Sequence, residues 1–146
     1  MLSVQSGRGR VRTLAAIGFL ALIAAGPPPG VVNPDVTQDN IDRTICVHGW
    51  TTTIRPSVGY TNRVKREMLG LAPSVDMKAF ELDHFIPLEL GGHPTDKRNL
   101  WPQPWGGTCG AHAKDAVEND LHRKVCSHRM TLADAQVEIT KGCWGQ

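Results

Sequence analysis

The stretch that most constrains the fold runs from Glu81 to Pro104, ELDHFIPLELGGHPTDKRNLWPQP. Residues 78–90 predict a strand, and the segment GGHPTDKR that follows is rich in residues that favour turns. The segment NLWP then predicts a second short strand. The sequence therefore predicts a β-hairpin with a wide loop between its strands.

Asp83 and His84 stand side by side in the first predicted strand, where burial disfavours the charged form of both. Neighbours on a strand point to opposite faces, but Pro87 predicts that the strand is distorted there, so the two side chains can reach different partners around one centre. A carboxylate binds a hard cation, and an imidazole takes a proton from water near physiological pH. This pair suits hydrolysis of a phosphodiester, in which a metal offsets charge on the phosphoryl oxygens.

Asn99 begins the returning segment of the hairpin. Its amide both donates and accepts hydrogen bonds, so we expect it to tie the backbone of the loop and to hold the imidazole in one orientation. The remaining ligand is expected from the helix that follows the hairpin. The candidates on that helix are His112, Asp115, Glu118, Asn119 and His122.

Three segments have the features of helices. Residues 61–71 have Thr61 or Asn62 as a cap, and residues 131–142 have Thr131 and Asp134 in capping-box positions. Residues 112–126 have helical periodicity, with an apolar side at Ala113, Ala116 or Val117, Leu121 and Val125. With the hairpin, these helices predict an α+β fold that is preceded by irregular extended segments.

The N-terminus has the layout of a secretory signal peptide, with Arg8, Arg10 and Arg12 before the apolar run LAAIGFLALIAA. This run is shorter than the roughly 20 apolar residues that a membrane span needs, so residues 1–26 predict a signal peptide, with an uncleaved N-terminal anchor as the alternative. Residues 27–40 are rich in Pro, Gly and polar residues and predict a linker. The folded domain is therefore expected at residues 41–146.

Removal of residues 1–26 would change the charge of the chain. The 146 residues include 16 Lys and Arg and 14 Asp and Glu. Without its three N-terminal arginines, the processed chain has 13 basic residues against 14 acidic ones, a net charge of about −1. A polyanion would therefore have to be held by a local patch or by a metal rather than by the field of the whole protein.

The cysteines Cys46, Cys109, Cys126 and Cys143 are even in number and contain no C-x-x-C pair. In an exported chain, this pattern favours two disulfides over a zinc knuckle. Three pairings are possible for four cysteines. Free thiols are the alternative and would require a reducing compartment.

The Asp83-His84 pair, PLELGG, the Asn99-Leu100 pair and a following helix with polar ligand candidates resemble the signature of HNH endonucleases, whose core is the ββα-metal finger. Over residues 44–144, the chain is more closely similar to small bacterial HNH-type proteins that are predicted to be exported. The segments that carry this similarity are TICVHGW, YTNRVK, LDHFIPLELGGHPTDKRNLWPQPW, KDAVENDLHRKVC and LADAQVEI. The Asp-His, Gly-Gly and Asn-Leu combination at this spacing is its most specific part.

The resemblance implies an α+β fold with a ββα-metal core, flanking helices and an irregular N-terminal extension, stabilised here by disulfides. It also implies that His84 is the general base, Asp83 a metal ligand and Asn99 the residue that orients the loop. The chain departs from the family pattern after the second strand, because a Gly-rich insertion delays the helix and the zinc knuckle is absent. His112 then fits best as the helix-side ligand, since it stands where the helix would begin to face the hairpin. The alternatives share helix faces in two pairs, Asp115 with Asn119 and Glu118 with His122.

Four basic residues flank the expected site and are candidate contacts for nucleic-acid phosphates. They are Lys97, Arg98, Lys114 and Arg123. The alternative is that they are exposed charges without such a role. Trp101 and Trp105 could stack on bases, but in a chain with few aromatic residues we expect them to fill the core.

The sequence thus predicts a metal-dependent endonuclease that hydrolyses phosphodiester bonds in DNA, with RNA as the alternative substrate. It would use His84 and one divalent cation, Mg in the first place, with Mn, Ni or Zn as alternatives. By resemblance, the products would carry a 5′ phosphate and a 3′ hydroxyl. The expected location is secreted or periplasmic, without stable membrane association after processing. The alternative function is an exported, non-catalytic module that binds nucleic acid or another partner on an HNH scaffold.

Overall fold

The computed structural model describes residues 30–70 and 76–145. The α-helices are α1 (Trp50–Ile54), α2 (Val58–Leu69), α3 (Ala111–Cys126) and α4 (Leu132–Thr140), and the strands are β1 (Phe80–His84) and β2 (Leu100–Pro104). Short 3-10 helices lie at Gln38–Arg43, Met77–Ala79, Leu88–Leu90, Lys97–Asn99 and Cys143–Gly145. The predicted α+β class is confirmed.

The two strands pair antiparallel as one hairpin, in which Asp83 lies opposite Trp101 and His84 opposite Leu100. The strand expected over residues 78–90 is shorter than predicted, because β1 ends at His84 and Pro87 begins a 3-10 turn. Asp83 and His84 are therefore the last two residues of their strand.

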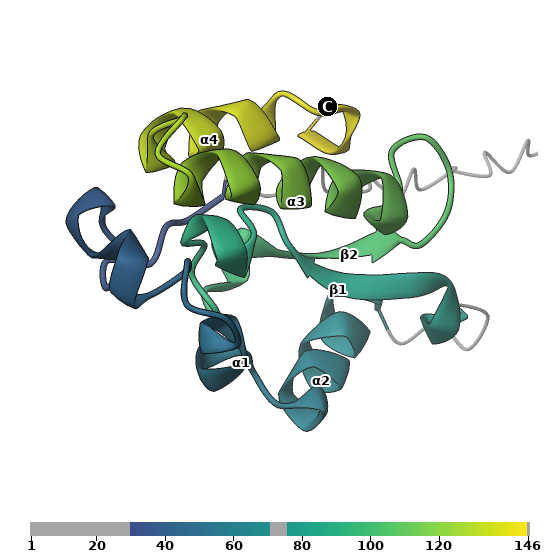
Figure 1. The fold of residues 1–146 in the computed structure, drawn as a ribbon. Coiled ribbons are helices and arrows are strands. Elements are labelled where there is room, and N and C mark those ends of the chain that lie inside the picture. Colours follow the sequence, from purple (N-terminus) through teal and green to yellow (C-terminus); the bar gives the residue numbers. More distant parts are fainter. Residues whose placement is uncertain (1–29, 71–75, 146) are drawn as a thin grey trace, which may run out of the picture.

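The hairpin lies between two groups of helices, with α3 and α4 on one side and α1 and α2 on the other (Figure 1). Two clusters of apolar side chains fill these layers. The smaller one is formed by Val64 of α2 with Leu82 and Leu100 of the hairpin. The larger one joins α3 and α4 to the N-terminal segment and to the turn after β1, with Ile41, Phe85, Leu90, Leu121, Val125 and Ile139 among its members.

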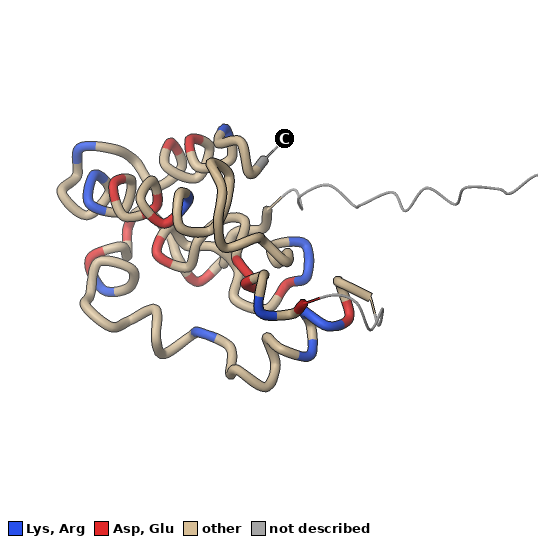
Figure 2. Tube along the Cα trace, turned by 90° about the vertical axis from the view of Figure 1, so that its right-hand side faces the viewer, with Lys and Arg blue, Asp and Glu red and all other residues tan. Residues whose placement is uncertain are grey.

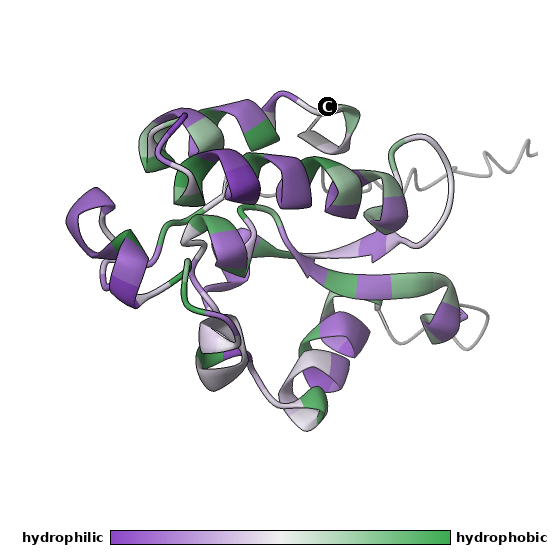
Figure 3. Ribbon diagram, viewed as in Figure 1, coloured by the Kyte–Doolittle hydropathy of each residue, from purple (hydrophilic) through white to green (hydrophobic). Residues whose placement is uncertain are grey.

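Helix α3 buries Leu121 and Val125 as predicted, but the first half of its buried face differs from the prediction. Its buried residues are Ala111, Lys114, Leu121 and Val125. Ala116 and Val117, which were expected on the apolar side, are exposed. Hydrophilic positions are therefore interspersed among the hydrophobic ones along α3 (Figure 3). The physical reason is that a lysine takes a core position of this helix, so the spacing of its apolar residues alone does not predict the buried face.

Helix caps follow the prediction in α4 but not in α2. Thr131 caps α4, where its side chain accepts a hydrogen bond from Asp134 N at 3.1 Å, as predicted. Helix α2 begins earlier than expected, at Val58, and Ser57 is its cap. Ser57 has the side-chain oxygen that an N-cap needs, so Thr61 lies inside the helix instead of at its start.

Residues 30–40 pack against the domain, although residues 27–40 were expected to form a linker. Val36 is buried in the larger core, and Val32 forms an antiparallel bridge with Gly92. The folded part of the chain therefore begins before Ile41. The predicted signal peptide and residues 27–29 lie outside the described residues. Among the described helices, none is long and apolar enough to cross a membrane.

Both expected disulfides are present. Cys46 pairs with Cys126, which ties the segment before α1 to the end of α3, and Cys109 pairs with Cys143, which ties the Gly-rich loop to the C-terminal turn. The prediction of two disulfides is confirmed, and none of the four cysteines is free. Disulfides persist in oxidising compartments, so this pairing indicates an oxidising environment for the folded protein.

Candidate functional site

The side chain of Asn99 ties together the two ends of the hairpin loop. Asn99 is fully buried; its Oδ1 accepts hydrogen bonds from Ile86 N at 2.9 Å and Val31 N at 3.2 Å. Its Nδ2 donates to Ile86 O and to His93 O, each at 3.0 Å. The amide therefore uses both donor hydrogens and accepts twice at its oxygen, which fixes the backbone on either side of the loop.

Gly92 is required at the turn beside Asn99 because the backbone passes too close for a side chain. A Cβ atom on Gly92 would lie 1.7 Å from Ile86 O. Gly91 has a φ of 73°, in the left-handed region that favours glycine. The Gly-Gly pair thus lets the loop fold back onto the end of β1.

This loop sets the orientation of His84. The His84 side chain is buried, and its Nε2 lies 2.9 Å from Pro94 O. A carbonyl oxygen only accepts, so Nε2 carries the hydrogen and Nδ1 keeps its lone pair. Burial lowers the pKa of His84, against the opposing effects of the Pro94 carbonyl and the Asp83 charge. His84 is therefore a neutral imidazole near pH 7, with Nδ1 as its basic atom.

Lys114 of α3 is fully buried beneath the end of β1. Its Nζ donates to His84 O at 2.8 Å, lies 2.7 Å from Asp83 Oδ2 and also donates to Glu118 Oε1. The contact with Asp83 is an ion pair whose geometry falls short of a hydrogen bond. Burial disfavours the ammonium, but the charges of Asp83 and Glu118 outweigh it and raise the pKa of Lys114. Lys114 is thus an internal cation that holds both carboxylates in place.

A pocket of about 100 Å³ opens above this ion-pair cluster. Five carboxylates line the pocket, namely those of Glu81, Asp83, Glu89, Asp115 and Glu118. The other lining residues are Thr51, Arg55, His84, Pro87 and Leu88. Burial is the main cause that raises the pKa of both Glu81 and Glu118 to about 7, and it also raises the pKa of Glu89. Carboxylates crowded in this way favour a bound cation, because each one disfavours the charge of its neighbours.

The donor set fits a hard divalent cation such as Mg²⁺, which binds carboxylate oxygens and water. Lys114 contacts Asp83 Oδ2 and Glu118 Oε1. Among the described residues, no group donates a hydrogen bond to the second oxygen of either carboxylate. Asp83 Oδ1 and Glu118 Oε2 therefore retain the capacity to bind a metal while the ammonium stays in place.

The structure does not bring His112 into this pocket. His112 was preferred as the helix-side ligand, but its side chain is 72% exposed and its ring lies 5.4 Å from that of Trp105. Asp115 and Glu118, which were the alternatives, line the pocket, whereas Asn119 is exposed and donates to Asp115 O. Helix α3 begins beside the start of β1, because His112 N donates to Trp105 O, and Pro104 before it lies opposite Phe80. Residues further along the helix, Lys114 and Glu118, therefore reach the end of β1 in place of His112.

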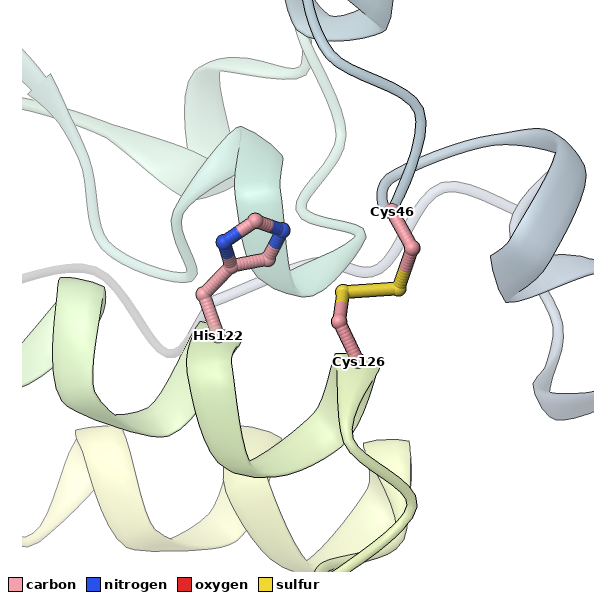
Figure 4. Close-up of side chains that lie close together, drawn as sticks. All are labelled: Cys46, His122 and Cys126. Carbon is pink, nitrogen blue, oxygen red and sulfur yellow. A yellow bond between two sulfur atoms is a disulfide. The ribbon is translucent and has the colours of Figure 1, made fainter.

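His122 lies in a second cluster, beside the disulfide between Cys46 and Cys126 (Figure 4). Potential ligand atoms of these three residues lie within 4.8 Å of one another, a spacing that a metal could bridge. A metal binds thiolates, however, and both sulfurs are joined to each other, so the oxidised protein offers only the histidine here. His122 Nε2 lies 2.9 Å from Ile45 O, which gives the ring a structural contact.

The four predicted phosphate contacts lie in ion pairs. Lys97 pairs with Glu67 at 2.7 Å, Arg98 with Asp96 at 2.6 Å and Arg123 with Asp120 at 3.2 Å. Lys114 is fully buried and cannot reach a phosphate at the surface. None of the other three lines the pocket. The charges of Lys97, Arg98 and Arg123 are thus matched by neighbouring carboxylates, and Lys114 belongs to the buried ion-pair cluster of the site itself.

The ion pair of Asp96 with Arg98 makes the loop that holds His84 sensitive to pH. Hydrogen bonds from Arg98 lower the pKa of Asp96 from 3.8 to about 2. The stability that this carboxylate contributes is thus fully present above pH 3.8 and is lost as the pH falls through about 2. We expect Asp96→Asn to lower the melting temperature at neutral pH, with a difference from the wild type that shrinks below pH 3.8.

The control for that measurement is Asp39→Asn, which changes an exposed aspartate of the 3-10 helix Gln38–Arg43 that forms no ion pair among the described residues. Thermal melts of the three proteins across the acid range test the prediction. A difference between Asp96→Asn and the wild type that stays constant with pH would show that the carboxylate charge is not responsible.

Comparison of the chain with protein-family models, with curated proteins and with solved structures finds no match. Arg55, Glu81 and Glu89 line the pocket but were not among the residues predicted for the site. One sequence signal points to Lys114 and Glu118. Both stand on the stripe Ala111, Lys114, Glu118, Leu121 and Val125, whose alternating steps of three and four residues mark one face of a helix.

Proposed function

We propose that the protein is a metal-dependent endonuclease with an HNH-like ββα-metal core, which hydrolyses phosphodiester bonds in DNA. One observation carries the proposal: a neutral, oriented histidine with a basic Nδ1 lines the same pocket as the carboxylates of Asp83 and Glu118. A base beside oxygen ligands for a cation is the set that hydrolysis of a phosphodiester by water requires.

His84 acts as the general base. Its Nδ1 takes a proton from a water molecule, the water oxygen attacks phosphorus, and the bond to the 3′ oxygen breaks. The departing 3′ oxygen takes a proton from solvent water, which leaves a 5′ phosphate and a 3′ hydroxyl. Asn99 is a positioning residue, because it fixes the loop whose Pro94 carbonyl holds Nε2. The lowered pKa of His84 keeps the base unprotonated near neutral pH.

Asp83 and Glu118 would hold the divalent cation, with Asp115 and Glu89 close by in the same pocket. When bound, the cation, Mg²⁺ in the first place, would supply positive charge that offsets charge on the phosphoryl oxygens and on the departing 3′ oxygen. Lys114 keeps the two carboxylates in place from beneath. The ligand on the helix side is therefore Glu118 in this proposal, in place of His112.

The proposed location is secreted or periplasmic. Two disulfides within the folded domain support an oxidising environment. The arrangement of arginines and apolar residues before Gly26 supports export through a signal peptide.

The second candidate is an exported module that binds nucleic acid or another partner without turnover. It is favoured by Lys114, whose ammonium already pairs with both carboxylates that would bind the metal and offsets part of their charge. If this internal cation fully satisfies the cluster, the pocket has no need of a divalent ion, and the scaffold serves recognition alone.

Supercoiled plasmid is the probe that separates the two functions. Purified oxidised protein is incubated with the plasmid in Mg²⁺, Mn²⁺, Ni²⁺ or Zn²⁺, and each reaction is repeated with excess EDTA. The nuclease proposal predicts nicked plasmid with at least one metal and none with EDTA. Retarded but uncut plasmid under every condition would favour the binding module.

A further inference from the structure

A second groove lies beside the pocket and shares residues with it. Its volume is about 240 Å³, and the first turns of α2 and the strand β1 form its sides. Arg55, Glu81 and His84 line both the groove and the pocket. The groove therefore leads to the general base proposed above.

The groove is lined by two cations, Arg55 and Lys65, and by one carboxylate, that of Glu81, whose pKa is raised by burial to about 7. Neither cation forms an ion pair within the part of the chain that the structure describes. The chain from α1 through most of α2 has basic but no acidic residues until Glu67 (Figure 2). Lys65 donates one hydrogen to Phe80 O at 2.8 Å, and an ammonium has two more to offer. This differs from Lys97, Arg98 and Arg123, whose charges are matched by neighbours.

Trp105 places an aromatic ring on the same groove. It was expected to fill the core, but it is 38% exposed. The His112 ring lies 5.4 Å away at an interplanar angle of 32°, which restrains the indole from one side. Trp101, by contrast, packs against the larger core. An exposed and restrained indole beside two unpaired cations is the combination that binds single-stranded nucleic acid, because the bases stack and the phosphates pair with the cations.

We propose that this groove binds a single-stranded segment of nucleic acid next to the phosphate that is cleaved, with Trp105 stacked on a base and with Arg55 and Lys65 paired with phosphates. The inference rests on the proposed function for the place of cleavage, since His84 joins the groove to the pocket. An unpaired strand is the occupant because its base can leave its neighbours and lie on the indole, which a paired base within a duplex cannot.

Binding is tested without cleavage, in EDTA, by fluorescence anisotropy of labelled oligothymidylate and oligouridylate of about twelve nucleotides. We expect Trp105→Ala to weaken binding of the preferred strand roughly tenfold, the usual effect of losing one stacked base. An abasic strand of the same length should bind equally to the wild type and to the variant. Arg55→Gln and Lys65→Gln should each lower the slope of log affinity against log salt by about 1.

Two matched controls carry the same substitution outside the groove, Lys97→Gln and Arg123→Gln, and both should bind as the wild type does. Circular dichroism confirms that each variant is folded. The proposal is overturned if Trp105→Ala binds the strands as tightly as the wild type, or if it loses as much affinity for the abasic strand.

The groove and the nuclease proposal can fail separately. Plasmid nicking by the wild type together with unchanged strand binding in Trp105→Ala, Arg55→Gln and Lys65→Gln would overturn the groove alone. Strand binding that depends on these residues, without nicking in any metal, would overturn the nuclease proposal and leave the groove in place.

Discussion

Replacement of His84 by alanine is expected to lower kcat for DNA cleavage roughly 10²–10⁴-fold, the usual contribution of a general base. The physical reason is that His84 lines the pocket and that Nδ1 is its basic atom, since Nε2 donates to Pro94 O. The rate is measured on end-labelled DNA at saturating Mg²⁺. Added imidazole should restore part of the activity, because it can supply a base to the space that the side chain leaves.

His48→Ala is the matched control for that experiment, since His48 is an exposed histidine outside the pocket. Its cleavage rate should equal that of the wild type. Because His84 is buried, the melting temperature of each variant is recorded alongside its rate. Full activity in a folded His84→Ala protein would remove the assigned base, and so would a loss of activity that tracks loss of folded protein and is not rescued by imidazole.

Replacement of Lys114 by methionine is expected to lower the free energy of unfolding by about 3–5 kcal/mol, the usual cost of removing one partner from a buried ion pair. The ammonium is fully buried between Asp83 and Glu118, so the variant leaves two carboxylates without their counter-charge. It also leaves His84 O without the hydrogen bond from Nζ. Urea unfolding followed by circular dichroism measures the change.

Lys124→Met is the control, because Lys124 pairs with Asp120 on the exposed side of the same helix. Exposed pairs contribute less than about 1 kcal/mol, so this variant should unfold almost as the wild type does. Neutralising the carboxylates in the Lys114→Met background, with Asp83→Asn and Glu118→Gln, should recover part of the lost stability. Equal effects of the two lysine substitutions would show that Lys114 is not the counter-charge of the cluster.

The hairpin and its loop could be predicted from the sequence because their signals are local. Pro87 marks the end of β1, and Gly91 and Gly92 mark a turn that only glycine permits. Asn99 bonds to the backbone of Ile86 and His93 in its own loop, which the sequence predicts, but its bond with Val31 N joins a distant part of the chain and has no local signal. A cap such as Thr131 depends on one helical turn and is predictable for the same reason.

The helix side of the site could not be predicted, because it depends on how α3 is rotated against the hairpin. A buried lysine takes a core position there, whereas the apolar pattern predicts Ala116 or Val117 at the buried face, and both are exposed. The buried stripe instead contains Lys114 and Glu118, whose placement depends on Asp83 from a distant part of the chain. Ion pairs between distant parts of the chain leave one local signal, which is polar residues at the three- and four-residue steps of a buried helix face.

The assumption of a linker before Ile41 failed for a similar reason. Prolines and glycines in residues 27–40 suggested an unfolded segment, but Val36 has a partner in the larger core and Val32 pairs with Gly92. Local composition gives no information about such distant partners. The same holds for Trp105, whose exposure depends on where the Gly-rich loop leaves the hairpin.

The most direct measurement is the Mg²⁺-dependent nicking of supercoiled plasmid by three proteins purified in parallel: the wild type, Asp83→Asn and Asp120→Asn. Asp83 lines the pocket, whereas Asp120 is paired with lysine and arginine on the surface of α3 and serves as the matched control. The proposed site predicts that the wild type and Asp120→Asn nick the plasmid, that EDTA stops both, and that folded Asp83→Asn does not nick it. Equal nicking by all three proteins, or none by the wild type with any divalent metal, would contradict it.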